Sequence, residues 1–276
     1  MSWLDALILG IVQGLTEFLP ISSDGHLSIA QKFLAWHSGR TQTGEENLFF
    51  VVMVHLGTLA AIIVYYRRVW LRAIRGVLGS SDLEPGYDRA SVIRTCLLAI
   101  VATVPAVFVG LLLKKRIEAA FASLTAAGIG FIITGCVLLV TTRLKGGEKG
   151  PAQTTWLDAL LIGLAQAFAP LPGVSRSGLT ITSGLARGLS REWAVGFSLL
   201  MAVPVIAGAG VLELKDVTPA MLAPEFLWPT IFAAIVAGLV GYGAILWLVR
   251  LARAGRLWYF SVYLFVLGIG VLILAR

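Results

Sequence analysis

Six uninterrupted apolar runs constrain this 276-residue chain more than any other feature of its sequence. Each run is long enough to cross a bilayer, which takes about 20 helical residues. Charged residues make up only 13% of the chain, against roughly 25% in soluble domains. We therefore expect an all-α integral membrane protein, not a soluble enzyme or a nucleic-acid binder. The six predicted transmembrane helices are Leu48–Tyr66, Thr95–Leu113, Leu124–Thr142, Trp193–Leu212, Leu227–Val249 and Leu257–Ala275.

Two further apolar segments, residues 3–36 and 156–189, are interrupted in the middle. The first is broken by the Pro-, Ser- and Gly-containing stretch 20–25, and the second by the similar stretch 170–178. Each half is too short to span a bilayer. Non-helical backbone at membrane depth is tolerated only where protein or a water-filled cavity surrounds it. The sequence therefore predicts two broken re-entrant helical hairpins in addition to the six spans.

The two interrupted segments are copies of each other. Residues 3–25 align without gaps on residues 156–178 and share nine identities over 23 positions. Three predicted spans lie between the copies, and this odd number inverts the second copy relative to the first. The expected fold is an inverted-topology repeat whose halves, residues 1–150 and 151–276, form one structural unit. Such repeats place their functional site near the bilayer midplane, where the broken helices meet.

Basic residues predict the orientation of the chain. The segments 67–94, 143–155, 187–191 and 250–256 hold 14 of the 22 Lys and Arg residues. Loops enriched in Lys and Arg normally face the cytoplasm. We therefore expect both termini and the first hairpin on the outer side and the second hairpin on the cytoplasmic side.

The hairpins also carry polar side chains that are rare at membrane depth and usually functional there. Gln13 and Glu17 are four residues apart, so they project from one helix face. Arg176 would be the only strong cation facing those groups if the hairpin tips meet. The glycines of the breaks, such as Gly173, would let backbone N–H groups approach a ligand closely. The full polar set is Gln13, Glu17, Ser22, Ser23, Asp24 and His26 in the first hairpin, and Gln166, Ser175, Arg176, Ser177 and Thr180 in the second.

Several of these residues also have a structural interpretation. Gln13 and its repeat mate Gln166 are equally consistent with hydrogen bonds between helices. Glu17 and Arg176 are consistent with an ion pair that only fixes the two halves together. His26 is also consistent with a core histidine.

Other polar residues are better explained by structure than by chemistry. Ser22 is expected to cap the following helix. Asp5 and Asp158 begin helices in both copies, where a carboxylate favours the helix dipole. His37 and His55 are expected to lie outside the cluster, as a loop residue and a lone polar residue in a span.

Taken together, a carboxylate, hydroxyls, an imidazole and an arginine favour phosphoryl transfer. Arginine binds phosphate through two hydrogen bonds, and a hydroxyl or an imidazole can attack phosphorus. The sequence contains no P-loop, which argues against a nucleotide-driven device. The type 2 phosphatidic acid phosphatase motif requires a further downstream histidine, and this chain has none after His55.

The motifs resemble those of a known family. QGLTEFLPISSDGH, residues 13–26, is similar to the (E/Q)xxxE motif and SSxGH loop of the bacitracin-resistance-type undecaprenyl-diphosphatases, and PGVSRSGLT, residues 172–180, is similar to their PGxSRSxxT motif. The resemblance implies a bacterial plasma-membrane enzyme that converts undecaprenyl diphosphate to undecaprenyl phosphate. That product is the recycled lipid carrier for peptidoglycan and other cell-wall polymers. The resemblance further implies bacitracin resistance on overproduction, an active site facing the outer (periplasmic) side, and a divalent cation, Mg²⁺ or Ca²⁺.

The resemblance also assigns roles to individual residues. It implies catalytic roles for Glu17, Ser23, His26 and Arg176, with either Ser23 or His26 as the nucleophile. Asp24 departs from the small hydroxyl residue expected after the paired serines, and we expect it to bind substrate or metal. The metal ligands are expected to be Glu17 with Gln13 or Asp24. The expected substrate-binding set is Gln13, Asp24, Gly173, Ser175, Arg176, Ser177 and Thr180.

One rival function comes from a different class. Inverted repeats with broken helices are typical of transporters, so a polyprenyl-phosphate flippase is the alternative. Clustering of a nucleophile, an imidazole and an arginine favours the hydrolase, since lipid transport does not require that set. The expected partners are a polyprenyl diphosphate substrate and membrane lipids, with no nucleic acid, and the sequence leaves a homodimer open.

Overall fold

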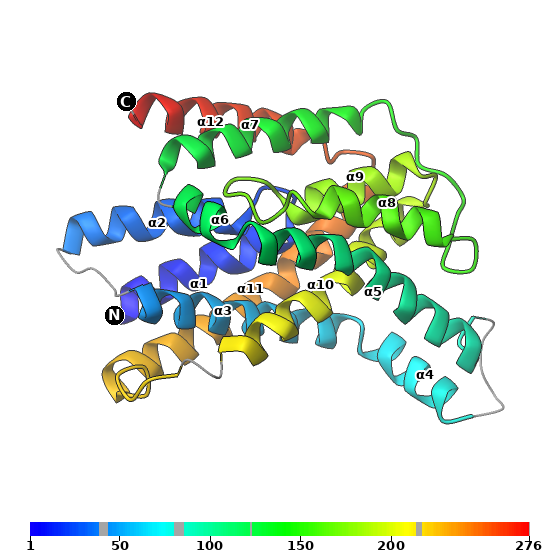
Figure 1. Cartoon of the computed structure of the whole chain (residues 1–276), viewed down its shortest axis with the longest axis horizontal. Coiled ribbons are helices and arrows are strands. Elements are labelled where there is room, and N and C mark those ends of the chain that lie inside the picture. Colours follow the sequence, from blue (N-terminus) through cyan, green and yellow to red (C-terminus); the bar gives the residue numbers. More distant parts are fainter. Residues whose placement is uncertain (39–43, 80–85, 122, 214–216, 276) are drawn as a thin grey trace.

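The computed structural model describes residues 1–38, 44–79, 86–121, 123–213 and 217–275, which form helices and no strand (Figure 1). In chain order the helices are α1 (Trp3–Phe18), α2 (Ser23–Ser38), α3 (Gly44–Tyr65), α4 (Arg67–Val77), α5 (Arg89–Leu112), α6 (Lys114–Phe121), α7 (Leu124–Val140), α8 (Trp156–Gln166), α9 (Arg176–Ala186), α10 (Arg191–Glu213), α11 (Pro224–Arg253) and α12 (Tyr259–Leu274). The predicted all-α class is confirmed.

Four of these helices, α3, α5, α10 and α11, are long and apolar enough to cross a membrane, and a fifth span is present if α6 and α7 count together. They correspond to predicted spans. The helix α12 is apolar but has only 16 residues, and α7 has 17. Four to five such helices identify a multi-pass membrane protein.

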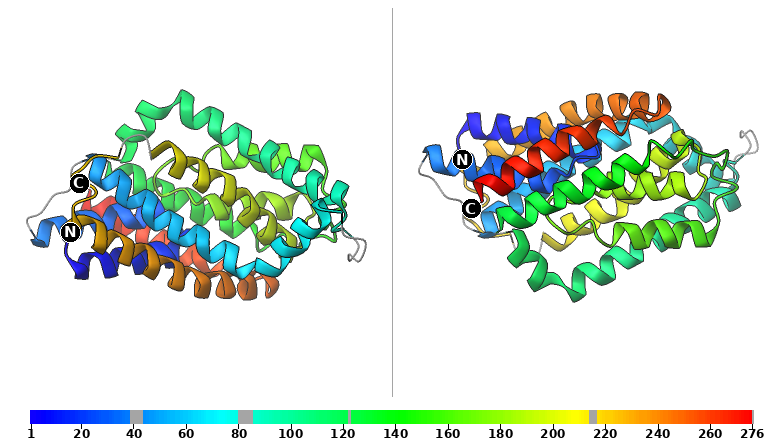
Figure 2. Two further views of the ribbon diagram at one scale, coloured as in Figure 1. Left: turned by 90° about the horizontal axis from the view of Figure 1, so that it is seen from below. Right: turned by 90° about the horizontal axis from the view of Figure 1, so that it is seen from above.

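The two interrupted segments form helix–loop–helix units. Helices α1 and α2 run from the end that carries both termini to the middle of the molecule and back, whereas α8 and α9 do the same from the opposite end (Figure 1). Both termini lie at one end, and α4 lies at the other (Figure 2). The breaks therefore bring two loops, far apart in the sequence, to the centre of the molecule.

Matching helix caps begin the two units. Ser2 and Asp5 form a capping box on α1, and Thr155 and Asp158 form the same box on α8. Each serine or threonine accepts a hydrogen bond from the third helical N–H, and the aspartate accepts one in return. Asp158 is fully buried and also pairs with Lys149 at 3.0 Å and Arg187 at 2.8 Å. The structural roles predicted for Asp5 and Asp158 are confirmed.

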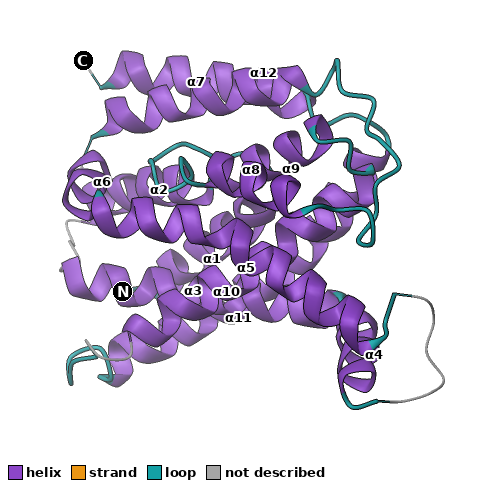
Figure 3. Ribbon diagram, turned by 45° about the vertical axis from the view of Figure 1, so that its right-hand side comes forward, coloured by secondary structure: helices purple, strands orange, loops and turns teal. Residues whose placement is uncertain are grey.

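Helix α11 lies against both α1 and α3, and glycines allow close contact there. A Cβ on Gly14 would lie 2.7 Å from the carbonyl oxygen of Ala237, and a Cβ on Gly57 would overlap the carbonyl oxygen of Ala234. Small residues at such contacts let helix backbones approach closely. Helices α7 and α12 form a separate pair along one side (Figure 3). The close packing of α1, α3 and α11 fixes how far the residues of α1 lie from those of α3.

Candidate active site

The loops of the two helical hairpins contact each other at the centre of the molecule. A Cβ on Gly25 would lie 3.0 Å from the Cα of Gly173. A Cβ on Gly130 of α7 would overlap the carbonyl oxygen of Pro172. Gly173 has φ +81°, a left-handed conformation that side chains disfavour. Glycine is therefore required at these positions for the tips to meet, a packing role that differs from the ligand approach predicted for the glycines of the breaks.

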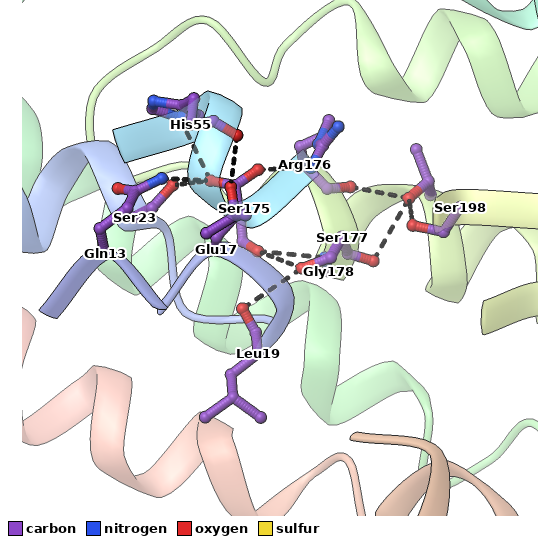
Figure 4. Close-up of polar contacts among 12 residues, drawn as sticks. Gln13, Glu17, Leu19, Ser23, His55, Ser175, Arg176, Ser177, Gly178 and Ser198 are labelled. Atoms are coloured by element: carbon purple, nitrogen blue, oxygen red, sulfur yellow. Dashed lines mark hydrogen bonds and ion pairs between the residues drawn. The ribbon is translucent and has the colours of Figure 1, made fainter. Parts of the chain in front are cut away.

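Glu17 of α1 is the centre of a buried polar cluster (Figure 4). Its Oε1 lies 2.6 Å from Nη2 of Arg176, which begins α9 in the other hairpin. Its Oε2 accepts hydrogen bonds from Ser23 Oγ at 2.6 Å and from Gln13 Nε2 at 3.2 Å. His55 Nε2 of α3 lies 3.3 Å from the same oxygen. The carboxylate thus joins three helices and the loop that starts α2.

Arg176 has a second nitrogen that is left without a partner. Nη1 is buried and makes no hydrogen bond to any described residue, while Nη2 holds Glu17. An unsatisfied buried guanidinium N–H is unusual and indicates a group that another molecule completes. The two nitrogens of one guanidinium match two oxygens of a phosphate.

A cavity of about 230 Å³ adjoins this cluster. Its polar wall includes Glu17, Ser23, His55 and Arg176, and Asp24 lines it as well. Asp24 also lines a larger cleft of about 1060 Å³ on the side of the molecule that carries the N-terminus. The remaining wall of the smaller cavity is largely apolar, from Ala106, Val107, Ala169, Pro170, Val174, Val205 and Ile206.

Side chains from α7, from α9 and from the residue that caps α9 hold the second loop. Ser175 caps α9 by accepting a hydrogen bond from the Gly178 N–H at 3.1 Å. Thr134 of α7 accepts the Ser175 N–H at 3.0 Å and lies 3.0 Å from the Gly173 carbonyl oxygen, to which it donates. Ser177 donates to the carbonyl oxygen of Leu19 in the first hairpin. These bonds keep Arg176 directed at Glu17.

Two predicted site residues have largely structural contacts. Thr180 is buried and bonded to Ser198 at 2.7 Å and to the carbonyl oxygen of Arg176 at 2.9 Å. Gln166 donates to the carbonyl oxygen of Ala102 at 3.3 Å, as expected of a hydrogen bond between helices. Its Oε1 is buried without a partner among the described residues, and Gln166 lines the cavity.

His26 does not lie in the cluster where the sequence analysis expected it. Its Nδ1 donates to the Ser22 carbonyl oxygen at 2.7 Å, and its Nε2 lies 2.7 Å from the hydroxyl of Tyr263 in α12. The ring stacks on Tyr263 and packs edge-on against Phe131. His26 is not among the described residues that line the cavity. Ser22, which precedes α2, has φ 70°, and α2 starts from this turn with His26 facing Tyr263 of α12.

Two residues of this site were not predicted from the sequence. His55 was expected to lie outside the cluster, which is wrong, since it contacts Glu17. The available signal was a single ionisable residue inside an apolar span, which is rare there but indicates function only where a partner lies within reach. Thr134 had no such signal, because a threonine that bonds its own helix backbone is ordinary in a span.

The oxygen ligands expected to hold a cation can be compared with the geometry. Gln13 Oε1 is buried without a hydrogen-bond partner among the described residues, and it adjoins Glu17. The described part of the chain contains no group of three or more His, Cys, Asp and Glu side chains arranged around a metal position. Two carboxylates and one amide nevertheless suit Mg²⁺, which takes one or two carboxylates and completes its shell with water and substrate phosphates. The donor types of Gln13, Glu17 and Asp24 therefore fit a hard divalent cation.

Comparison with known proteins agrees with the motifs. Residues 6–270 match the family model described as Bacitracin resistance protein BacA. The chain belongs to this family. It is 42% identical to the undecaprenyl-diphosphatase of Carboxydothermus hydrogenoformans, over 99% of this chain and 98% of that protein. It is also 42% identical to the undecaprenyl-diphosphatase of Acidiphilium cryptum, over 94% and 92% of the two chains, and 40% identical to that of a Nocardioides species, over 99% and 97%.

The role of Thr134 can be tested by an isosteric change. Thr134→Val leaves the buried Ser175 N–H without its acceptor, and such a loss costs about 1–3 kcal/mol. We expect a lower midpoint of thermal unfolding in detergent. Thr230→Val is the matched control, because in the described part of the chain the buried Thr230 hydroxyl bonds only the Phe226 carbonyl oxygen of its own helix. Equal midpoints for the two variants would contradict the loop-holding role.

Proposed function

We propose that this protein hydrolyses undecaprenyl diphosphate to undecaprenyl phosphate and inorganic phosphate. Membership of the family and the names of its full-length relatives support this activity. The product is a lipid carrier for cell-wall polymers, and removal of the diphosphate gives bacitracin resistance because that drug sequesters it. These names do not support the flippase alternative.

Within the site, the unpartnered nitrogen of Arg176 gives the main support for hydrolysis of a diphosphate. Arg176 Nη1 is buried, unpartnered among the described residues and next to a cavity that also exposes Ser23. A guanidinium that completes its hydrogen bonds with a phosphate would hold the terminal phosphorus near that hydroxyl. The apolar wall formed by Val107 and Ile206 suits the first prenyl unit of the lipid.

The proposed reaction begins with Ser23. Its hydroxyl already donates to Glu17 Oε2 at 2.6 Å, so Glu17 is in position to take the proton as Ser23 Oγ attacks the terminal phosphorus. The anhydride P–O bond breaks, and Glu17 passes the Ser23 proton to the undecaprenyl phosphate that leaves. Water then attacks the phosphoserine and gives one proton to Glu17, the P–Oγ bond breaks, and Glu17 returns that proton to Ser23 Oγ as phosphate is released. Arg176 and the N–H groups at the start of α9 stabilise the charge on the transferring group.

The contacts favour Ser23 over His26 as the nucleophile. Both ring nitrogens of His26 are engaged, one by the Ser22 carbonyl oxygen and one by the Tyr263 hydroxyl. Ser23 has both a proton acceptor and access to the cavity. We assign His26 to holding the Ser22 turn that presents Ser23.

A divalent cation forms part of the proposal. Glu17, Asp24 and the amide oxygen of Gln13 would hold it, with Gly173, Ser175, Ser177 and Thr180 shaping the phosphate loop opposite. When bound, the cation supplies positive charge that neutralises the diphosphate. Asp24 has the position for this role, because it lines both the cavity and the outer cleft.

We also propose a repeat structure, a number of membrane spans and an orientation for the chain. Residues 1–150 and 151–276 are the two halves of an inverted repeat, with six transmembrane helices and two re-entrant hairpins in the bacterial inner membrane. The site opens to the outer side, which is supported by the cleft near Met1 and Glu225, at the end that carries both termini. A homodimer is compatible with this arrangement, and the proposed site uses residues of one chain only.

Phosphate release is the direct test of this function. We expect purified protein in detergent to release phosphate from undecaprenyl diphosphate, and a chelator to abolish the release until Mg²⁺ or Ca²⁺ is added back. The Glu17→Gln variant is the inactive control, because it lacks the base. Absence of release by the wild-type protein with either cation would rule out the hydrolase.

We use the term phosphate clamp for the proposed grip of Arg176 on a substrate phosphate through two hydrogen bonds. The clamp predicts that arginine and lysine at position 176 support different rates. Arg176→Lys keeps the charge but loses the two-pronged hydrogen bond, so we expect a rate at least about tenfold lower, which corresponds to about 1.4 kcal/mol. Arg176→Ala should lose nearly all activity. If Arg176 only neutralises Glu17, a lysine supplies the same charge, so a wild-type rate in Arg176→Lys would refute the clamp.

Orientation can be tested by labelling with a membrane-impermeant maleimide. The two free cysteines, Cys96 and Cys136, are first replaced by serine because both are exposed. A cysteine at exposed Pro224 should then react in intact cells, whereas one at exposed Glu148 should react only after lysis. Labelling of Glu148→Cys in intact cells would reverse the proposed orientation.

A further inference from the structure

His55 is the one member of the Glu17 cluster that the proposed reaction leaves without a role. It lies on α3, outside both motifs, and lines the same cavity. Its Nδ1 lies 2.8 Å from the Val51 carbonyl oxygen, and its Nε2 lies 3.3 Å from Glu17 Oε2. Both neighbours are hydrogen-bond acceptors, so each ring nitrogen contributes an N–H.

We infer that His55 is a positioning residue, whose Nε2–H holds the Glu17 carboxylate with Oε2 towards Ser23. The inference rests on the proposed function, since it assigns Glu17 as the base for Ser23. His55 acts through Glu17 and contacts neither Ser23 nor Arg176 by a hydrogen bond among those the described residues make.

Competition between Glu17 and the substrate phosphate for Arg176 explains why a positioning residue is needed. In the structure Arg176 holds Glu17 Oε1 at 2.6 Å, which is the shortest contact of that oxygen. A phosphate that binds both guanidinium nitrogens takes Nη2 from Glu17 as well as Nη1, and Glu17 Oε1 then loses this partner. Gln13 is on the same helix as Glu17, so it moves with it, whereas His55 is on α3. His55 therefore anchors the carboxylate to a second helix while Arg176 binds substrate.

The Val51 contact makes the orientation of the imidazole definite. Because Nδ1 donates to the backbone of its own helix, the ring is fixed with Nε2 towards Glu17. A carboxylate held from two helices has fewer rotamers, and reacting groups displaced by about 1 Å can lose 10²-fold in rate. The expected effect of losing His55 is thus on turnover, not on substrate affinity.

Two amide substitutions at position 55 distinguish the contribution of Nε2 from that of Nδ1. The glutamine side-chain nitrogen matches the position of Nε2, and the asparagine nitrogen matches Nδ1. His55→Gln keeps the bond to Glu17, whereas His55→Asn keeps only the bond to Val51, and His55→Leu keeps neither. A structural role through Val51 would be rescued by Asn, and the positioning role would be rescued by Gln.

The experiment measures kcat and KM for phosphate release from undecaprenyl diphosphate by these three variants. We expect kcat of His55→Gln to stay within about tenfold of wild type, and kcat of His55→Asn and His55→Leu to fall about 10²-fold, with KM unchanged within about twofold. Thr58→Val is the matched control, since among the described residues this buried threonine of α3 bonds only the His55 carbonyl oxygen of its own helix. Size-exclusion chromatography checks that each variant is monodisperse.

Several results would overturn the role of His55. These are equal rates for His55→Asn and His55→Gln, wild-type turnover in His55→Leu, or a raised KM with unchanged kcat. If His55→Leu fails to fold, the comparison of His55→Asn with His55→Gln still decides. Failure of the wild-type protein to release phosphate has a different meaning, because it removes the proposed function itself.

Discussion

The ion pair between Glu17 and Arg176 is the contact on which the arrangement of this protein depends. It joins two hairpins whose paired residues are 159 positions apart in the chain. Burying two charges is expensive, and their attraction compensates only when further hydrogen bonds satisfy the remaining atoms. Gln13, Ser23 and His55 supply such bonds to Glu17. Arg176 Nη1 has no equivalent partner among the described residues, so both oxygens of Glu17 are satisfied and one nitrogen of the guanidinium is not.

That asymmetry distinguishes the Glu17–Arg176 pair from the other buried ion-pair cluster of the described residues. The second buried carboxylate, Asp158, shows the contrast, because Lys149, Arg187 and the Thr155 backbone satisfy it fully at the start of α8. Natural proteins leave polar groups unsatisfied mainly where function requires it. We propose that a phosphate binds at this unpaired nitrogen of Arg176, which lies next to the cavity.

The amino-acid sequence predicted the meeting of Glu17, Ser23 and Arg176 for a physical reason. Breaks in apolar segments expose backbone that lipid cannot solvate, so the two breaks had to be buried against protein. Duplication of the segment then predicted that the breaks face each other. The directions of single side chains could not be predicted in this way. His26 faces Tyr263, 237 residues away, from a helix that starts at the Ser22 turn. No local pattern encodes that partner.

His55 was not predicted as a residue of the site for a different reason. The distance between two helices, and not the direction of a side chain, decided its contact. A lone histidine in an apolar span indicates function only if a partner lies within reach, and that depends on how closely the helices pack. Gly57, two residues along α3, lets the backbone of α3 contact Ala234 of α11, and Gly14 lets α1 contact Ala237 one turn away. Both helices are thus drawn onto the same surface of α11, which brings His55 to within 3.3 Å of Glu17. Small residues at these helix contacts therefore decide which side chains belong to the site. With larger residues there, α1 and α3 would lie too far apart for the imidazole to reach the carboxylate.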